Sequence, residues 1–396
     1  MFSVRVFVKS ACPVAIASRH LSTSISATGS SFPFTYFYND VYKVVLPEKH
    51  KFPMDKYGKI RHRLQERLQM DGIAYSSTDA KDFIHKAKNG ADSSVQAEFK
   101  LSPLATMEEL QTTHCPNYIR RFLQGDLTAA EVRAVGFPWS QEGVNRSLSS
   151  VGGTLAATRH VLSAASAQKV QGGGSTAEPS PPRWAAHLAG GTHHAFFDRG
   201  EGFCVFSDIA VAANCAFKEF PSVKNVLIID LDVHQGNGNA SLFSRNPNVF
   251  TFNMHCKSNL FSELQVSDVD VELPAGCTGE EYLRHLARWL PFLFETLQPQ
   301  LVFYQAGVDV LESDRLGRMA LSRQDIRARN AMVYKAVYDS KAALVVTMGG
   351  GYPTDLDPSS ASYLDTIDAH VDVYHQLPLT HAEKRRETRD NGDGGY

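Results

Sequence analysis

Several features that would assign the 396-residue sequence to a particular class of protein are missing from it. Its six cysteines form no Cys-x-x-Cys pair, which argues against a structural zinc knuckle and against a secreted disulfide framework. It has no run of about 18 apolar residues, the length needed to span a bilayer. The net charge is −2 and basic residues are not clustered in the folded part, so the charge pattern gives no indication of direct nucleic-acid binding. These absences favour a chain with reduced cysteines that folds around its own core.

The first 34 residues contain no aspartate or glutamate. They are rich in serine and carry Arg5, Lys9 and Arg19, which is the composition of an import leader. Lys9 and Pro13 interrupt the apolar stretch that a secretory signal needs. We therefore predict that residues 1–34 are a disordered targeting leader. The predicted destination is the mitochondrion, with the plastid, nucleus and cytoplasm as alternatives.

Short β-branched segments alternate with longer amphipathic ones along the rest of the chain. This pattern predicts one α/β domain over residues 35–380, with a single mostly parallel β-sheet and helices on both faces. Strands are predicted at 225–230, 248–254, 301–307 and 343–351, and helices at about 149–170, 207–218, 280–297 and 323–339. The Gly-, Ser- and Pro-rich stretch 171–184 is predicted to be a flexible insertion loop, and residues 381–396 a disordered tail.

The segment IIDLDVHQGNG, residues 228–238, begins as a buried strand and then carries polar side chains that a core cannot hold alone. Asp230, Asp232 and His234 alternate along it and would project to one face of a strand. Ligands of open α/β sheets bind at the carboxyl ends of the strands, where Gly236 lets the chain curl. We predict a metal site here. The structural alternative is a helix N-cap beside a solvated histidine.

Two further predicted strands end beside polar side chains. Asp309 follows LVFYQAG, and Tyr352 follows VTMGGG. Asp232, His234 and Asp309 would give a divalent cation three protein ligands and leave a position for water, as in a catalytic zinc site. Taken alone, Asp309 would more often be a turn or cap residue and Tyr352 a core tyrosine.

Two adjacent histidines lie on a glycine-flanked loop. His193 and His194 follow Gly190 and Gly191, and a loop of this kind rarely needs two imidazoles for packing. The pair suits two separate roles at a reacting centre, although a single buried histidine is more often bonded to a carbonyl. Phe203, in GFC, fits either an aromatic wall or an ordinary core position.

The ordered set of motifs resembles the zinc-dependent histone deacetylase family, which has the arginase/deacetylase three-layer fold. The resemblance covers about residues 100–365 and is nearest to the class IV and bacterial deacetylase-like branch. The motifs that carry it are, in order, HCPNYI, GFPWS, GGTHHA, GEGFCVFSDIA, IIDLDVHQGNGN, YQAGVDVLESDRLG and GGGY.

The resemblance implies an amidohydrolase that removes acetyl or longer acyl groups from lysine side chains of histones or other proteins. Its implied cofactors are one zinc ion and a structural monovalent cation, K⁺, that Asp230 helps to hold. The site residues that it assigns are His193 and His194 at the attacking water, Tyr352 at the substrate carbonyl, Asp230 behind His193, zinc on Asp232, His234 and Asp309, and Gly202, Phe203, Gly350 and Gly351 along the substrate.

Some positions depart from the family pattern or leave alternatives open. Asn237 stands where many members carry an aspartate behind the second histidine, which would make His194 less basic. The second wall of the substrate tunnel falls to Leu260 or Phe261. Gly236 occupies the position where a two-metal ureohydrolase of this fold needs an acid, which argues against that reaction. A deacetylase of small acetylated amines and a weakly active acyl-lysine-binding pseudoenzyme remain alternatives, and the sequence does not fix the oligomeric state.

Overall fold

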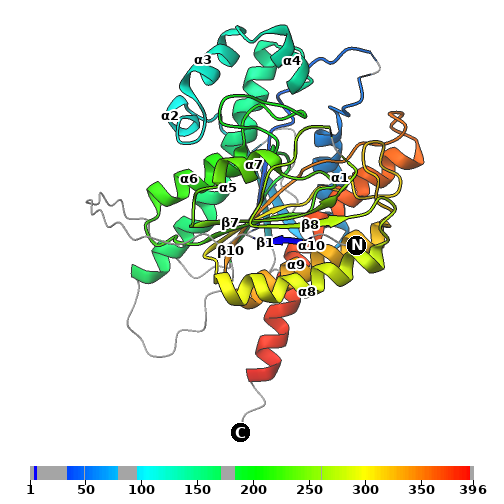
Figure 1. The fold of residues 1–396 in the computed structure, drawn as a ribbon. Helices are drawn as coiled ribbons and strands as arrows, with labels where there is room; N and C mark the ends of the chain where they lie inside the picture. Colours follow the sequence, from blue (N-terminus) through cyan, green and yellow to red (C-terminus); the bar gives the residue numbers. More distant parts are fainter. Residues whose placement is uncertain are drawn as a thin grey trace.

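The computed structural model describes residues 4–6, 34–48, 50–78, 96–170, 183–259 and 261–392. A ten-stranded sheet runs through it in the order β1-β8-β7-β6-β9-β10-β5-β2-β4-β3. Strands β2 to β10 all pair in parallel, and β1 is antiparallel to β8 at one edge. The predicted mostly parallel sheet with helices on both faces is therefore confirmed (Figure 1).

The strands and helices have the following bounds. The strands are β1 (Val4–Val6), β2 (Phe34–Tyr38), β3 (Ala74–Ser77), β4 (Gln96–Leu101), β5 (Trp184–His187), β6 (Val226–Asp230), β7 (Val249–Cys256), β8 (Val269–Leu273), β9 (Leu301–Gln305) and β10 (Ala343–Thr347). The helices are α1 (Lys56–Met70), α2 (Met107–Leu110), α3 (Pro116–Gln124), α4 (Ala129–Val135), α5 (Gln141–Val170), α6 (Asp208–Glu219), α7 (Asn237–Phe243), α8 (Gly279–Leu297), α9 (Arg323–Ser340) and α10 (Ala361–Gly392).

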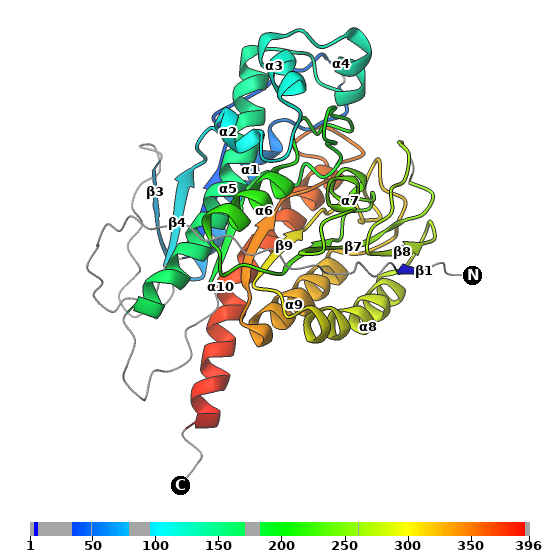
Figure 2. The same ribbon diagram turned by 60° about the vertical axis from the view of Figure 1, so that its left-hand side comes forward.

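Helices cover both faces of the sheet (Figure 2). Neighbouring helices α1, α10, α9 and α8 pack in sequence on one face, and α5 packs against α6 on the other. Strand β6 shows how one sequence serves both layers. Leu227 and Ile229 belong to the core under α8 and α9, whereas Val226 and Ile228 belong to the core under α5 and α6. A parallel strand buried on both faces is continuously apolar, and for this reason β6, β7, β9 and β10 could be predicted.

Regular structure extends into two regions that were predicted to be disordered. Val4–Val6 form β1, inside the predicted leader. Helix α10 continues to Gly392, well into the predicted tail. One reason is that the ring of His381 packs edge-on against Phe34 and Trp184, which fixes this part of the helix to the domain. The prediction of a disordered tail from residue 381 is therefore wrong up to Gly392.

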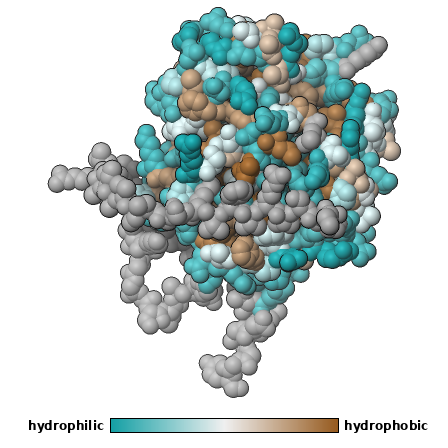
Figure 3. Space-filling view, in the orientation of Figure 1, coloured by the Kyte–Doolittle hydropathy of each residue, from teal (hydrophilic) through white to brown (hydrophobic). Residues whose placement is uncertain are grey.

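Other predicted segments lie outside the described residues. These are residues 1–3 and 7–33 of the leader, residues 171–182 of the insertion loop and residues 393–396 of the tail. The predicted insertion loop, 171–184, extends too far, because Trp184 is buried and begins β5. Across the described part of the chain, no helix combines the length and the apolarity that crossing a membrane requires. On the face drawn in Figure 3, hydrophobic residues lie in patches among hydrophilic ones.

Candidate active site

Four neighbouring strands in the middle of the sheet, β6, β9, β10 and β5, end at one edge. Because these strands are parallel, the loops after them meet there. These loops carry the polar side chains predicted from the sequence: Asp232 and His234 after β6, Asp309 after β9, Tyr352 after β10, and His193 and His194 after β5.

Asp232, His234 and Asp309 meet in one cluster, where their ligand atoms lie within 4.8 Å of one another. Strand β6 ends at Asp230, so a loop, and not a shared strand face, brings Asp232 and His234 together. Backbone groups orient both carboxylates. Val233 N–H donates to Asp309 Oδ1 over 2.9 Å, and Gly350 N–H donates to Asp232 Oδ2 over 2.7 Å.

The cluster has the character of a cation site. Asp309 Oδ2 is buried and accepts no hydrogen bond from any described residue, and its ion-pair partner His234 Nδ1 lies 3.2 Å away. Burial and the neighbouring Asp232 raise the pKa of the Asp309 carboxyl to about 6, because two buried carboxylates repel each other. A Cβ at Gly350 would lie 2.0 Å from Asp309 Oδ2, so the backbone must approach closely here. Two carboxylates and an imidazole around one point are a donor set that suits zinc.

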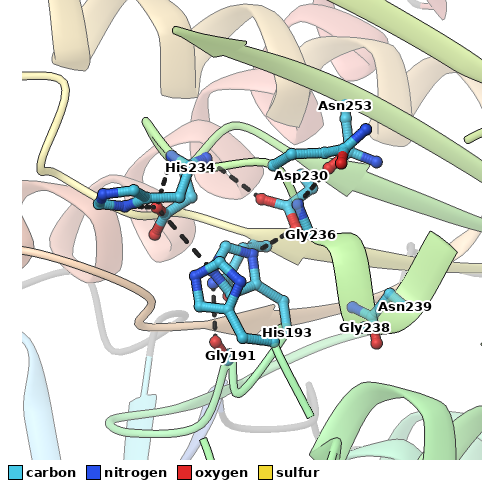
Figure 4. Close-up of polar contacts among 12 residues, drawn as sticks. Gly191, His193, Asp230, His234, Gly236, Gly238, Asn239 and Asn253 are labelled. Carbon is cyan, nitrogen blue, oxygen red and sulfur yellow. Dashed lines mark hydrogen bonds and ion pairs between the residues drawn. The ribbon is translucent and has the colours of Figure 1, made fainter. Parts of the chain in front are cut away.

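His193 and His194 lie beside this cluster, with ring centroids 4.0 Å apart. His193 Nδ1 donates to Asp230 Oδ2 over 2.7 Å, since a carboxylate can only accept (Figure 4). Burial disfavours a charged His193, but Asp230 and Asp232 outweigh it and raise the pKa to about 9. His194 Nδ1 instead lies 2.7 Å from the amide oxygen of Asn237. Burial, followed by the neighbouring His193 and His234, holds the pKa of His194 well below its ordinary value.

The histidine loop is held by two residues to which sequence reasoning gave no role. Asp208, at the start of α6, accepts hydrogen bonds from Gly191 N–H at 2.9 Å and Thr192 N–H at 2.7 Å. Gln305 Nε2 donates to Gly191 O over 2.9 Å. An acid in the first turn of a helix is ordinarily explained by the helix dipole, so Asp208 gave no sign of this second contact.

Tyr352 is held by its backbone and by neighbouring rings. Its N–H donates to Asp314 Oδ2 over 2.6 Å, and its ring lies 5.9 Å from that of Phe203. Burial, followed by Asp309 and Asp232, holds the pKa of the Tyr352 phenol well above its ordinary value. Buried Lys56 donates to Gly351 O over 3.1 Å and places Nζ 5.3 Å from the Tyr352 ring centroid. The phenol is therefore a neutral hydrogen-bond donor.

A pocket of 360 Å³ opens above these groups. Gly202 has a φ of 56°, and a Cβ there would lie 2.7 Å from Phe261 and 2.8 Å from His194. Phe203 and Phe261 both line the pocket. Of the two candidates for the second wall, Phe261 therefore fits, and Leu260 lies outside the described residues. The lining residues are Lys51, Arg133, Ala134, Val135, Gly136, His194, Gly202, Phe203, His234, Ser258, Asn259, Phe261, Leu316, Arg318 and Tyr352.

Gly350 and Gly351, which were assigned to the substrate, lie beside the pocket and are not among the described residues that line it. Their backbone groups serve Asp232 and Lys56. A Cβ at Gly350 would lie 2.0 Å from Asp309 Oδ2, and one at Gly351 would lie 2.5 Å from His370 Nε2, so the lack of space explains glycine at both positions without a substrate contact.

Comparisons with known proteins agree with this architecture. Residues 77–366 match the sequence profile of the histone deacetylase domain. An uncharacterised protein of Picosynechococcus sp. is 34% identical over 324 residues, which are 82% of this chain and 93% of that protein. Histone deacetylase 2 of Arabidopsis thaliana is 35% identical over 43% of this chain and 44% of its own length.

Two further matches come from bacteria. The histone deacetylase-like amidohydrolase of Pseudomonas aeruginosa is 33% identical over 40% of this chain and 45% of its own length. The chain thus spans less than half of this protein and of the Arabidopsis one. The crystal structure of an HDAC homolog from Aquifex aeolicus shares the fold, with a TM-score of 0.63 at 20% identity over 88% of this chain and 84% of that chain. These relatives do not resolve the branch, and they do not support the predicted class IV placement.

Proposed function

The chain belongs to the histone deacetylase domain family, and from this premise we propose that it is a zinc-dependent hydrolase of acylated lysine side chains. The observation that carries the proposal is the buried cluster of Asp232, His234 and Asp309 beside a histidine pair. The acyl group is acetyl or longer, and the lysine belongs to a protein or peptide. Small acylated amines are the alternative substrates, because they present the same scissile amide.

Asp232, His234 and Asp309 would hold one zinc ion per chain. When bound, zinc would supply a water of lowered pKa and would polarise the acyl oxygen of the substrate. The orphaned oxygen of Asp309 and the repulsion between the two carboxylates both support a cation at this point. A structural K⁺ near Asp230 is also proposed, and it rests on the resemblance of this strand end to the family motif.

The remaining residues supply proton transfer and electrostatic stabilisation. His194, held neutral, is placed to take a proton from the attacking water and return it to the leaving amine. His193, paired with Asp230, carries the positive charge that stabilises negative charge developing on the acyl oxygen. Tyr352 donates a hydrogen bond to that oxygen, as its neutral phenol allows. Gly202, Phe203 and Phe261 confine an extended acyl-lysine stem in the pocket.

Two measurements on the purified chain test this proposal. Metal analysis after dialysis should give one zinc per chain, and a panel of acetyl- and longer acyl-lysine peptides should be hydrolysed. A chain that binds acyl-lysine with full zinc content and no turnover would be the pseudoenzyme alternative. A chain that retains no divalent metal and cleaves neither peptides nor small acylated amines would refute the proposal.

Mitochondrial location is a separate proposal that rests on the composition of residues 1–34 alone. Imaging of the full chain with a fluorescent protein at its carboxyl end tests it. A signal confined to the nucleus would contradict it.

A further inference from the structure

The side chain of Asn237 lies between His194 and the carboxylate of Glu201 and contacts both. Its Oδ1 lies 2.7 Å from His194 Nδ1, and its Nδ2 donates to Glu201 Oε1 over 2.9 Å. Ser262 Oγ donates to the same Glu201 oxygen over 2.7 Å. Glu201, Asn237 and His194 therefore form one continuous hydrogen-bond chain that ends at the reacting centre.

In this row of hydrogen bonds, the chemistry of each group decides whether it donates or accepts. The Glu201 carboxylate can only accept, so the NH₂ of Asn237 must face it. The amide oxygen of Asn237 then faces His194, and because that oxygen can only accept, His194 Nδ1 must carry the proton. A neutral imidazole protonated at Nδ1 has its lone pair on Nε2. This is the tautomer that can accept a proton on the ring edge away from Asn237.

We propose that Glu201 is a positioning residue that fixes the tautomer of His194 through Asn237, and that Glu201 is the reason an amide stands beside His194. A carboxylate at position 237 would lie 2.9 Å from the Glu201 carboxylate with no hydrogen between them. The Asn237 amide keeps the negative charge of Glu201 out of contact with His194. Glu201 therefore acts on His194 only by orienting the amide. The inference rests on the proposed hydrolase for its kinetic test but not for its spectroscopic one.

Other contacts reinforce the same orientation. Gly238 N–H donates to Asn237 Oδ1 over 3.0 Å, and Asn237 Nδ2 lies 3.3 Å from Glu263 O. Loss of Glu201 should therefore loosen the amide without releasing it. We expect E201A to lower kcat by about 10-fold, with KM changed less than twofold, because the hydrogen bond that orients the Asn237 amide behind the base is removed. E201Q loses the charge but keeps an oxygen that can accept from Asn237, so it should lose less activity than E201A.

The swap of the two functional groups is the decisive variant. N237D alone places two carboxylates in contact and should lower kcat more than E201A. In the double variant E201Q/N237D, the new amide can donate to the new carboxylate, which reverses the hydrogen bond between residues 201 and 237. The carboxylate at 237 still accepts from His194 Nδ1, so the chain of hydrogen bonds is restored and the tautomer of His194 is kept. The double variant should recover at least about 10-fold of the activity lost in N237D, since like-charge contact has been replaced by a hydrogen bond.

The assay uses the full zinc-loaded chain and an acetyl-lysine peptide, and ¹⁵N NMR of labelled histidine reports the tautomer of His194 directly. S262A is the matched control, since it removes the other hydrogen bond of Glu201 and leaves Asn237 in place. Expected are a larger share of the Nε2-protonated tautomer of His194 in E201A, an unchanged share in S262A, and rescue of activity in the double variant. An unaltered tautomer in E201A, an S262A effect as large as that of E201A, or no rescue would each overturn the inference. Failure of wild type to cleave any acylated amine would refute the proposed function and leave the NMR test standing.

Discussion

The floor and the mouth of the pocket are built in different ways. We define the floor by the buried site residues, which are oriented by hydrogen bonds to neighbouring loops and to the ends of β6 and α7. They are Asp232, His234, Asp309, His193, His194 and Tyr352. We define the mouth as the charged residues that line the pocket outside the floor. All of them are basic, although the chain has a net charge of −2. They are Lys51, Arg133 and Arg318.

The buried floor and the exposed mouth should therefore have different roles: the floor in catalysis and the mouth in the choice of substrate. None of the three mouth cations forms an ion pair with a residue that the structure describes, and each side chain is exposed. A floor whose geometry is fixed by buried hydrogen bonds should set kcat, because small displacements there alter the reacting geometry. A mouth of free, solvated charges should act on KM and should weaken as salt screens it. The predictions below test that division.

The largest effect is expected from a floor residue that holds the metal. Asp309→Asn replaces the carboxylate whose Oδ2 has no described hydrogen-bond donor. We expect loss of bound zinc on dialysis and a fall in kcat/KM of about 1000-fold or more, because Lewis-acid stabilisation is worth several kcal/mol. Metal analysis and steady-state rates measure both. Glu312→Gln, an exposed acid in the same loop, is the control and should keep zinc and rate. Full zinc content and rate in Asp309→Asn would remove this residue from the site.

A smaller effect is expected at the oxyanion donor. Tyr352→Phe removes one hydroxyl from the floor and leaves the backbone hydrogen bond to Asp314 in place. We expect kcat to fall by about 100-fold, the usual consequence of losing one such donor, with KM little changed. The matched control is Tyr363→Phe, which removes a phenol that bonds Asp55. Equal turnover by wild type and Tyr352→Phe would contradict the role of the phenol.

The floor could be predicted from the sequence further than its supports could. Asp232, Asp309 and Tyr352 follow apolar strands, so parallel pairing alone brings them to one edge. Glu201 and Asp314 act through contacts that join distant segments, and no local pattern marks an acid for such a role. Their hydrogen bonds exist only once the fold has formed.

Strands β5 and β8 were not predicted from the sequence, because local sequence patterns do not mark them as strands. β5 reads WAAH, and alanine has little preference for strands. β8 reads VDVEL, whose acids look like a solvent face, yet Asp270 accepts from Gln235 and Glu272 pairs with Lys257. Low strand preference therefore hid β5, and burial of polar side chains through tertiary partners hid β8 and the supports of the floor.

A third prediction concerns a residue that anchors the loop between floor and mouth. Buried His114 accepts from Ser207 N–H at Nε2 over 2.9 Å and donates from Nδ1 to Phe196 O over 2.9 Å. Burial lowers its pKa from 6.5 to about 4, so only the unfolded chain takes up a proton as pH falls below 6.5. Its contribution to stability is therefore complete above pH 6.5 and is lost toward pH 4. From pH 8 to pH 5 the loss is about 2 kcal/mol.

Chemical denaturation of wild type and His114→Gln at both pH values measures this contribution. Glutamine can both accept and donate here but does not titrate, so the stability difference between the two proteins should shift by about 2 kcal/mol in favour of the variant at pH 5. A pH-independent difference would show that His114 does not couple protonation to folding.

The smallest effect is expected at the mouth, where the free cations should favour acyl-lysine flanked by acidic residues over the basic sequences typical of histone tails. Between peptides with Asp or Glu and peptides with Lys or Arg beside the acyl-lysine, we expect about 10-fold in kcat/KM at low salt, carried by KM, since each exposed charge pair contributes up to about 1 kcal/mol. The triple variant Lys51→Gln, Arg133→Gln and Arg318→Gln should abolish the preference, and 0.5 M salt should reduce it in wild type. Arg245→Gln, an exposed arginine outside the pocket, is the control. A triple variant that lowers kcat as much as Tyr352→Phe would erase the distinction between mouth and floor, and an unchanged preference would assign selection to other residues.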